Sequence, residues 1–307
     1  MRFVIGVEGG GTKTNVALAD ENGKIITKSV SGPSNFLIVG FDKASENIIE
    51  GIEKCLSETG ISKTDLTSIM LGLTGAGRLF DQNNMKNAFT DYSQKCGFKF
   101  NHVVVNSDAR ISLEAAFPNK PGMIMIAGTG SIMFGKNSEG EIFRVGGWGR
   151  ILGDEGSGLF IGKKGLIAVI RQIDGRGDKT IISDIISEKY NLNSLETIIK
   201  AVYTDNFDIA SLAPSVYDAA NRGDRIAVGI LDEAVSELLL HVKTMVKKIK
   251  FEGKLGLAFV GSIITNDNYT RKRLVDEINK NISAVELIDS ESDPLEGAVI
   301  MAINSLK

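Results

Sequence analysis

The chain has 307 residues, of which 43% are hydrophobic and 24% are charged, and its formal net charge at pH 7 is −3. This length predicts one large or two ordinary globular domains. The hydrophobic and charged fractions exclude a largely disordered chain. The lack of a basic excess argues against non-specific nucleic-acid binding. The sequence contains no run of about 18 uninterrupted apolar residues, so no membrane span is predicted.

Strand and helix patterns alternate through the first third of the chain. Apolar strands are predicted on both sides of a glycine-rich turn, and the sequence ENGK at 21–24 predicts a hairpin turn before a third strand. A later strand runs into the sequence TGAG at 74–77. The predicted strands are 3–7, 16–19, 25–30, 68–73 and 102–106, and the predicted helices are 41–56, 81–96 and 109–117.

The same order of elements begins again after a break at 118–122. This architectural repeat of strand, Gly/Thr turn, strand, turn and strand predicts two similar halves with a cleft between them. From Ser157 the chain is mainly helical, and a final helix starts at Pro294 with Ser292 or Asp293 as its N-cap. The predicted strands here are 123–127, 132–135, 141–145, 255–260 and 285–288, and the clearest helices are 225–249 and 268–281.

Three glycine-containing turns follow apolar strands and are candidate phosphate-binding turns. Glycine lets backbone N–H groups approach an anion closely, and neighbouring Thr and Ser add hydroxyl donors. The P-loop pattern GxxxxGK[ST] is absent, and the dinucleotide pattern GxGxxG does not describe the first turn. Each turn alone could be a tight hairpin, but three of them in two halves favour a nucleotide. With the strand residues that precede them, they are 5–14, 126–131 and 259–262.

These motifs carry a resemblance that covers nearly the whole chain. The order VEGGGTKT, NSDAR, IAGTGS, GGWGRILGDEGS and FVGS resembles the N-acetylglucosamine kinase and BadF/BadG/BcrA/BcrD ATPase family, within the sugar-kinase/actin/hexokinase superfamily. The resemblance implies an α/β fold of two ribonuclease-H-like (actin-like ATPase) domains, with ATP and a sugar in the interdomain cleft. We expect a small domain at 1–117, completed by a returning helix at 294–307, and a large domain at 118–293.

The resemblance also implies which residues bind Mg²⁺-ATP. Glu8 matches the carboxylate that, in this family, orients Mg²⁺ through water. Lys13 could touch the phosphates, although an exposed lysine at the start of a strand is an equal alternative. The nucleotide residues implied by the resemblance are Gly10, Gly11, Thr12, Lys13, Thr129, Gly261, Ser262 and Asn266.

Asp108 is the expected catalytic base, because a carboxylate at a strand end suits acceptance of a proton from a sugar hydroxyl. The alternative is a helix N-cap, a role that Ser107 could share. Asp154 could instead form a capping pair with Glu155, Trp148 could be an interdomain packing residue, and Asn35 could be a turn residue. The sugar-binding residues implied by the resemblance are Asn35, Asp108, Ser131, Ile132, Gly147, Trp148, Gly149 and Asp154.

The sequence thus predicts an ATP- and Mg²⁺-dependent kinase that phosphorylates an amino sugar at O6, with N-acetylglucosamine first among the substrates. Ile132 is apolar where the mammalian amino-sugar kinase has a polar residue, so N-acetylmuramic acid, glucosamine, N-acetylmannosamine and plain hexoses stay open. An ATPase activator with a bridging iron–sulfur cluster is disfavoured, because the only cysteines are Cys55 and Cys96. These isolated thiols predict a cytoplasmic protein, and the resemblance implies a homodimer that binds a small sugar. The charge balance and the lack of a long apolar run predict no binding to nucleic acid and no membrane span.

Overall fold

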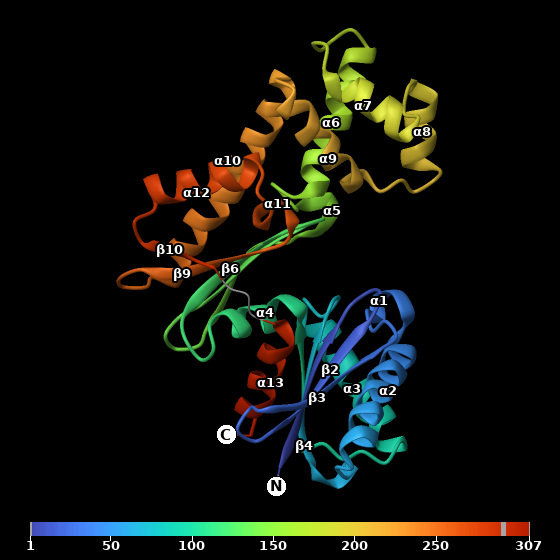
Figure 1. Cartoon of the computed structure of the whole chain (residues 1–307), viewed down its shortest axis with the longest axis vertical. Helices are drawn as coiled ribbons and strands as arrows, with labels where there is room; N and C mark the ends of the chain where they lie inside the picture. Colours follow the sequence, from blue (N-terminus) through green and yellow to red (C-terminus); the bar gives the residue numbers. More distant parts are fainter. Residues whose placement is uncertain (1, 290–292, 307) are drawn as a thin grey trace. The chain divides into compact units, whose positions relative to one another are not determined.

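A computed structural model describes residues 2–289 and 293–306. The chain folds into two compact units, one formed by the residues up to 120 together with the C-terminal helix, and the other by residues 121–289 (Figure 1). Each unit has its own five-stranded mixed sheet. In the part of the chain described, no helix is both long and apolar enough to cross a membrane.

The first unit is a sheet in the order β3-β2-β1-β4-β5, with helices on both faces (Figure 1). The first three strands are antiparallel, and β4 and β5 extend the sheet in parallel with β1. The strands are β1 (Phe3–Gly9), β2 (Thr14–Asp20), β3 (Ile25–Ser31), β4 (Leu66–Leu73) and β5 (His102–Ser107). The helices are α1 (Phe36–Val39), α2 (Phe41–Thr59), α3 (Leu79–Lys95), α4 (Asp108–Ala116) and α13 (Pro294–Asn304), with a 3-10 turn η1 (Lys63–Asp65).

Alternation along the strands gives this sheet a separate core on each face. Ile5 and Val7 pack into a core with α2 and α3, whereas Val4 points to the opposite core with α4 and α13. The C-terminal helix therefore returns to the first unit and covers a face that would otherwise be apolar and open. Cys55, on α2, is fully buried in the first of these cores.

The second unit repeats the topology of the first. Its sheet order is β10-β9-β6-β7-β8. Taken from β8 to β10, the neighbours are antiparallel, antiparallel, parallel and parallel, as they are from β3 to β5 in the first sheet, so the repeat inferred from the sequence is confirmed. The strands are β6 (Gly122–Ala127), β7 (Ser131–Lys136), β8 (Ile142–Gly146), β9 (Leu255–Val260) and β10 (Val285–Ile288). The helices are α5 (Gly149–Leu152), α6 (Gly158–Ile173), α7 (Ile181–Tyr190), α8 (Leu195–Tyr203), α9 (Ala213–Asn221), α10 (Arg225–Ile249), α11 (Ser262–Thr265) and α12 (Tyr269–Asn281), with a 3-10 turn η2 (Ile209–Leu212).

Two alternatives for the cap of the last helix were open in the sequence. Asp293 is the N-cap of α13, where its side chain accepts a hydrogen bond from the Leu295 N–H and also pairs with Lys28. Ser292 lies outside the described residues. The observed cap places an acid at the positive end of the helix dipole, which stabilises the helix start.

Asp224→Ala is expected to lower the free energy of unfolding of the second unit by about 2 kcal/mol at pH 7. Asp224 is buried and caps α10 by accepting hydrogen bonds from the N–H groups of Ile226 and Ala227. It also accepts hydrogen bonds from the Thr180 hydroxyl and the Ile181 N–H at the start of α7. One carboxylate therefore joins the starts of two helices, and its loss leaves buried donors without an acceptor.

The same site predicts a pH dependence of stability. Burial raises the pKa of Asp224, but the hydrogen bonds from Ala227, Thr180, Ile181 and Ile226 outweigh it, so the pKa lies below its usual value. A lowered folded-state pKa gives stability that is fully present above the unfolded pKa, near ~3.9, and is lost as the pH falls below it. Urea unfolding from pH 7 to pH 3 should show the wild-type advantage over Asp224→Ala shrinking below about pH 4. Asp208→Ala, which removes the cap of a short 3-10 turn, should have a smaller effect at every pH.

Candidate functional site

The carboxyl ends of the three parallel strands in the first unit are level with one another. Gly9 of β1 pairs with Leu73 of β4, and Leu73 pairs with Ser107 of β5. Ligand sites of α/β sheets commonly form at this end of parallel strands. The candidate phosphate turn, the TGAG turn and Asp108 each follow one of these three strand ends, so the sheet itself gathers them.

The turn between β1 and β2 is open to solvent and attached to the loop that carries Asn35. Gly11, Thr12 and Lys13 are exposed. The Gly10 carbonyl accepts hydrogen bonds from the backbone N–H groups of Ser34 and Asn35, both at 3.0 Å. Asn35 is half-buried and is the N-cap of α1, with its side-chain oxygen accepting from the Leu37 N–H at 3.2 Å. Asn35, a predicted sugar contact, therefore lies beside the phosphate turn and has a definite local role as a cap.

Glu8 lies on β1, opposite Asn15 of β2, and is half-buried. The Asn15 amide donates a hydrogen bond of 2.7 Å to Glu8 Oε2, which fixes one carboxylate oxygen and leaves acceptor capacity on the group. Within residues 2–289 and 293–306, no three His, Cys, Asp or Glu side chains gather closely enough to hold a metal ion by themselves. Mg²⁺ typically uses one or two carboxylates together with substrate phosphates and water, and a single fixed carboxylate fits that pattern.

Asp108 is the first residue of α4, and the N-cap of this helix is Ser107, whose hydroxyl accepts from the Arg110 N–H. The capping alternative for Asp108 is therefore wrong. Its carboxylate accepts hydrogen bonds of 2.7 Å from the Ala109 N–H at Oδ1 and from the Thr74 hydroxyl at Oδ2. The sequence indicated the TGAG turn but did not identify Thr74, because a contact between residues 34 positions apart leaves no local pattern.

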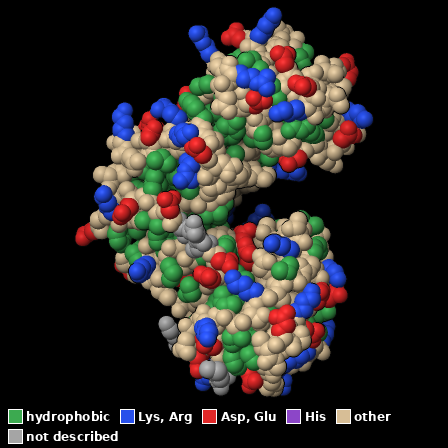
Figure 2. Space-filling view, viewed as in Figure 1, with side chains coloured by type: hydrophobic (Ala, Val, Ile, Leu, Met, Phe, Trp, Pro, Cys, Tyr) green, Lys and Arg blue, Asp and Glu red, His purple; other side chains and the backbone are tan. Residues whose placement is uncertain are grey.

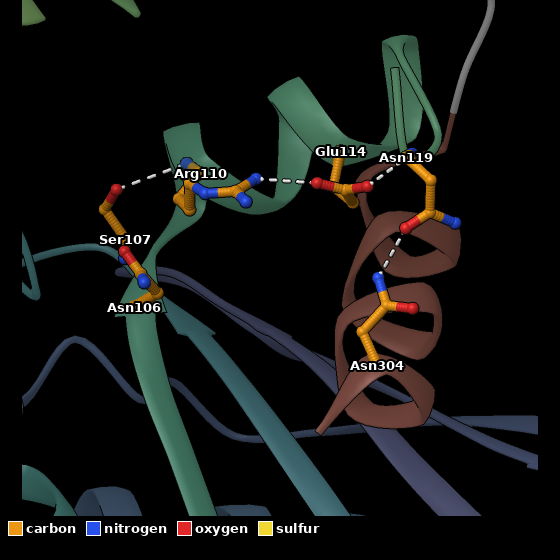
Figure 3. Close-up of polar contacts among 6 residues, drawn as sticks. All are labelled: Asn106, Ser107, Arg110, Glu114, Asn119 and Asn304. Atoms are coloured by element: carbon orange, nitrogen blue, oxygen red, sulfur yellow. Dashed lines mark hydrogen bonds and ion pairs between the residues drawn. The ribbon is translucent and has the colours of Figure 1, made fainter. Parts of the chain in front are cut away.

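The helix that carries Asp108 is anchored at its far end by a network of polar side chains (Figure 3). Arg110 pairs with Glu114 at 3.0 Å, and the other oxygen of Glu114 accepts from the Asn119 N–H at 2.7 Å. Asn304 of α13 donates to the Asn119 side chain at 2.7 Å. Glu114 is 2% exposed. A buried carboxylate with these partners holds the helix rigidly, so the orientation of its first residue is well defined.

Two segments of the second unit that were predicted to touch sugar are joined by hydrogen bonds. The Ser131 N–H donates to Asp154 Oδ1 at 3.3 Å, and the Ser131 hydroxyl donates to the Glu155 carbonyl at 2.6 Å. Asp154 has a left-handed backbone with φ of +65°. The N-cap of the following helix α6 is Ser157, so the alternative in which Asp154 and Glu155 form the capping pair is wrong.

The turn at Gly147 is held by Arg144, which the sequence did not indicate as a site residue. The Arg144 guanidinium donates hydrogen bonds to the carbonyls of Gly146 and Gly147 and lies 4.8 Å from the centre of the Trp148 ring. Gly147 has φ of +70°, and a Cβ there would lie 2.3 Å from Ile132. Within its own unit the Trp148 side chain is 68% exposed. Ile132, Gly147, Trp148 and Gly149 are thus neighbours at one end of the sheet.

Three of the four predicted nucleotide residues of the second unit line a cavity of about 610 Å³, and the fourth, Gly261, does not. Thr129, Ser262 and Asn266 belong to one side of it, and η2 and α9 form the other side, which the sequence did not predict. Burial raises the pKa of Tyr217 to about 12, against a hydrogen bond with Thr270, so this part of the wall is uncharged at neutral pH. The unpredicted lining residues are Gly128, Gly158, Asp208, Ala210, Ser211, Ala213, Pro214, Tyr217, Asp218, Asn221, Ile263, Asp267 and Asn268.

Two of the three acidic residues that line this cavity, Asp218 and Asp267, are paired with basic side chains. Asp218 is bound by both guanidinium donors of Arg222, at 3.0 and 2.9 Å, and Asp267 pairs with Lys272 at 2.9 Å. Gly261, which precedes Ser262, has φ of +94° and packs directly on the backbone of Ala127. A polar cavity with apolar patches from Ala213, Pro214 and Ile263, of this size, suits a nucleoside.

Known proteins resemble this chain over nearly its whole length. Residues 5–302 match the model of the BadF/BadG/BcrA/BcrD ATPase family. The N-acetylmuramic acid/N-acetylglucosamine kinase of Clostridium acetobutylicum is 36% identical over 98% of both chains, and the N-acetyl-D-glucosamine kinase of Dictyostelium discoideum is 33% identical over 99% of this chain and 98% of its own. A solved structure from Chromobacterium violaceum has the same fold, with a TM-score of 0.74 and 22% identity over 98% of this chain and 99% of its own.

Proposed function

Because this chain belongs to the BadF/BadG/BcrA/BcrD ATPase family, we propose that it is an ATP-dependent sugar kinase that phosphorylates an amino sugar at O6. N-acetylglucosamine is the first candidate substrate. One observation carries this proposal: β1, β4 and β5 end at the same level of the sheet. Asp108 and the candidate phosphate turn, which follow two of these strands, therefore lie at the same sheet edge.

In this proposal Asp108 accepts the proton of the sugar hydroxyl while that oxygen attacks phosphorus. ATP would supply the γ-phosphoryl group and leave as ADP, and Mg²⁺ held at this site would offset the negative charge of the phosphates. Glu8 would hold the hydrated metal, and Thr12 and Lys13 would contact the phosphates from the open turn. Phosphoryl transfer depends mainly on positioning and charge balance, so fixed side chains matter more than covalent chemistry. Gly10, Gly11, Thr129, Gly261, Ser262 and Asn266 complete the proposed nucleotide site.

The proposed sugar site uses the hydrogen-bonded segments around Asp154. Asp154 would accept hydrogen bonds from sugar hydroxyls. The Ser131 N–H contacts Oδ1, so the carboxylate keeps acceptor capacity for a ligand. Trp148 offers an exposed aromatic surface that suits the apolar face of a sugar ring. Asn35, Ser131, Ile132, Gly147 and Gly149 are the other proposed contacts. Water exclusion on sugar binding would limit wasteful ATP hydrolysis.

The alternatives within the same reaction are kinases for N-acetylmuramic acid, for glucosamine, or for hexoses in general. The Clostridium acetobutylicum relative is named for both N-acetylmuramic acid and N-acetylglucosamine, which makes cell-wall recycling a possible role. An ATPase activator stays disfavoured, since Cys55 is fully buried and burial raises the pKa of its thiol. A cysteine inside the core of one unit cannot reach a cluster that two subunits share.

Three further properties belong to this proposal. A cytoplasmic location is supported by two cysteines that are both free thiols, which is typical of reducing compartments. A homodimer is expected from the family resemblance, and a mass measurement in solution would test it. Binding to nucleic acid is not expected, because Lys and Arg side chains are interspersed with Asp and Glu on the face shown in Figure 2.

A coupled assay of ADP release with purified protein and Mg²⁺-ATP tests the proposed function. N-acetylglucosamine, N-acetylmuramic acid, glucosamine, N-acetylmannosamine and glucose are compared separately with a sample that contains no sugar. Sugar-stimulated ADP release is expected, and the ranking of kcat/KM identifies the substrate. Phosphorus NMR of the product tests transfer to O6. Steady hydrolysis that no sugar stimulates would contradict the kinase proposal and favour the activator.

A further inference from the structure

Thr74 is the residue at which the functional elements of the first unit meet. Its backbone N–H donates to the Gly9 carbonyl at the end of β1, at 2.9 Å, and its hydroxyl donates to Asp108 Oδ2 at 2.7 Å. Through these two bonds a single residue joins the strand that enters the phosphate turn to the carboxylate at the start of α4. No role for Thr74 followed from the sequence.

The residue after Thr74 extends this connection to the Asn35 loop. Gly75 has φ of +98°, and a Cβ there would lie 3.1 Å from the Asn35 side-chain oxygen. The Asn35 N–H in turn donates to the Gly10 carbonyl. The phosphate turn, the Asn35 loop and Asp108 therefore all border Thr74 and Gly75. The Thr74 hydroxyl itself contacts Asp108, so its loss should mainly affect that carboxylate.

The Asp108 carboxylate has a donor on each oxygen, and the two donors come from different elements. Ala109 belongs to the same helix and moves with Asp108, so its N–H does little to fix the side-chain rotation relative to the sheet. Thr74 belongs to the turn after β4, and its hydroxyl fixes that rotation from outside the helix. A carboxylate accepts several hydrogen bonds, so the remaining acceptor positions stay available for a substrate hydroxyl.

We propose that Thr74 is a positioning residue for phosphoryl transfer, which it serves by orienting the Asp108 carboxylate toward the hydroxyl of the acceptor sugar. This inference rests on the proposed kinase function. Thr74 acts through Asp108 and takes no proton itself, because its hydroxyl hydrogen is directed to Oδ2. Without this hydrogen bond the carboxylate would still lie near the sugar, but its oxygen would point less directly at the sugar hydroxyl. We therefore expect a lower kcat with little change in KM.

Thr74→Val tests this role, because valine keeps the shape of threonine and removes the hydroxyl. We expect kcat for the preferred sugar to fall by about 10- to 100-fold, which is the effect of losing one hydrogen bond to a charged group. The KM for sugar and for ATP should change by less than about threefold. Thr74→Ser should restore most of the turnover, since it returns the hydroxyl.

Thr67→Val is the matched control. Thr67 is half-buried near the start of β4, the strand that Thr74 follows, and its hydroxyl donates to the Phe3 carbonyl at 3.0 Å. This variant loses a comparable hydrogen bond, so we expect a loss of stability with kcat within about twofold of the wild type. Equal losses of kcat in Thr67→Val and Thr74→Val would show a general effect of sheet stability and overturn the proposal.

A double-mutant cycle with Asp108→Asn separates this proposal from the proposed function. If Thr74 acts through the carboxylate, adding Thr74→Val to Asp108→Asn should lower kcat by less than about twofold. A full additional loss would overturn the positioning role. Sugar-stimulated activity in the wild type with near-normal kcat in Thr74→Val would reject only the role of Thr74. If Thr74→Val does not fold, the comparison of Thr74→Ser with Thr74→Ala gives the same test.

Discussion

Asp108→Asn is expected to lower kcat of the sugar kinase by on the order of 10²–10⁴, with little change in sugar or ATP binding. The substitution keeps the size of the side chain and removes its ability to accept a proton at neutral pH. Helix α4 should keep its stability, since its N-cap is Ser107 and its far end is held by Arg110 and Glu114. Initial-rate kinetics and calorimetric titration of the sugar would measure the two effects separately.

Asp42→Asn is the matched control for this substitution. Asp42 is an exposed carboxylate in the first turn of α2, as Asp108 is the acidic residue in the first turn of α4. Both variants remove one negative charge from a helix N-terminus of the same unit, which costs at most about 1 kcal/mol of stability. Only Asp108→Asn should change turnover. Near-wild-type kcat in Asp108→Asn would reject Asp108 as the base.

The fold could be predicted from the sequence because local patterns in each half indicate its strands and turns. The strands 3–7, 68–73 and 102–106 are largely apolar runs that lead directly into Glu8, Thr74 and Ser107, and buried parallel strands are largely apolar in this way. The structure places each of them within a residue or two of the predicted bounds. The helical region after Ser157 was predicted only in outline, because its helices are short and their separation depends on caps such as Thr180, Asp208 and Asp224.

The site could be predicted only as far as its residues lie in recognisable motifs. Asp108 and Asp154 stand in such motifs, and the competing cap interpretations fail because the neighbouring serines 107 and 157 occupy the cap positions. Thr74 and Arg144 stand outside them. Their contacts, with Asp108 and with the Gly147 turn, depend on strand pairing and turn geometry, which a single sequence does not encode locally.

Gly261→Ala is expected to raise the Kd for ATP by on the order of 10², which would leave the enzyme inactive at ordinary ATP concentrations. A Cβ at Gly261 would lie 2.5 Å from the Ala127 carbonyl oxygen and 3.0 Å from the Gly128 nitrogen. Backbone atoms cannot rotate away as a side chain can, so the turn after β6 and the turn after β9 must separate. Those two turns carry Thr129 and Ser262, which face the same cavity, and their separation would spoil the nucleotide site.

Gly253→Ala distinguishes this close packing from simple backbone strain. Gly253 precedes β9 and has φ of +98°, nearly the same as the +94° of Gly261, but a Cβ at Gly253 would lie 4.0 Å from the Phe251 ring and so would meet no close contact. Both variants carry the cost of a left-handed alanine, about 1–2 kcal/mol, so both should unfold at lower temperature. Calorimetric titration with a non-hydrolysable ATP analogue and Mg²⁺ should show weaker binding in Gly261→Ala alone. Equal weakening in the two variants would mean that strain, and not the contact between the two turns, sets the affinity.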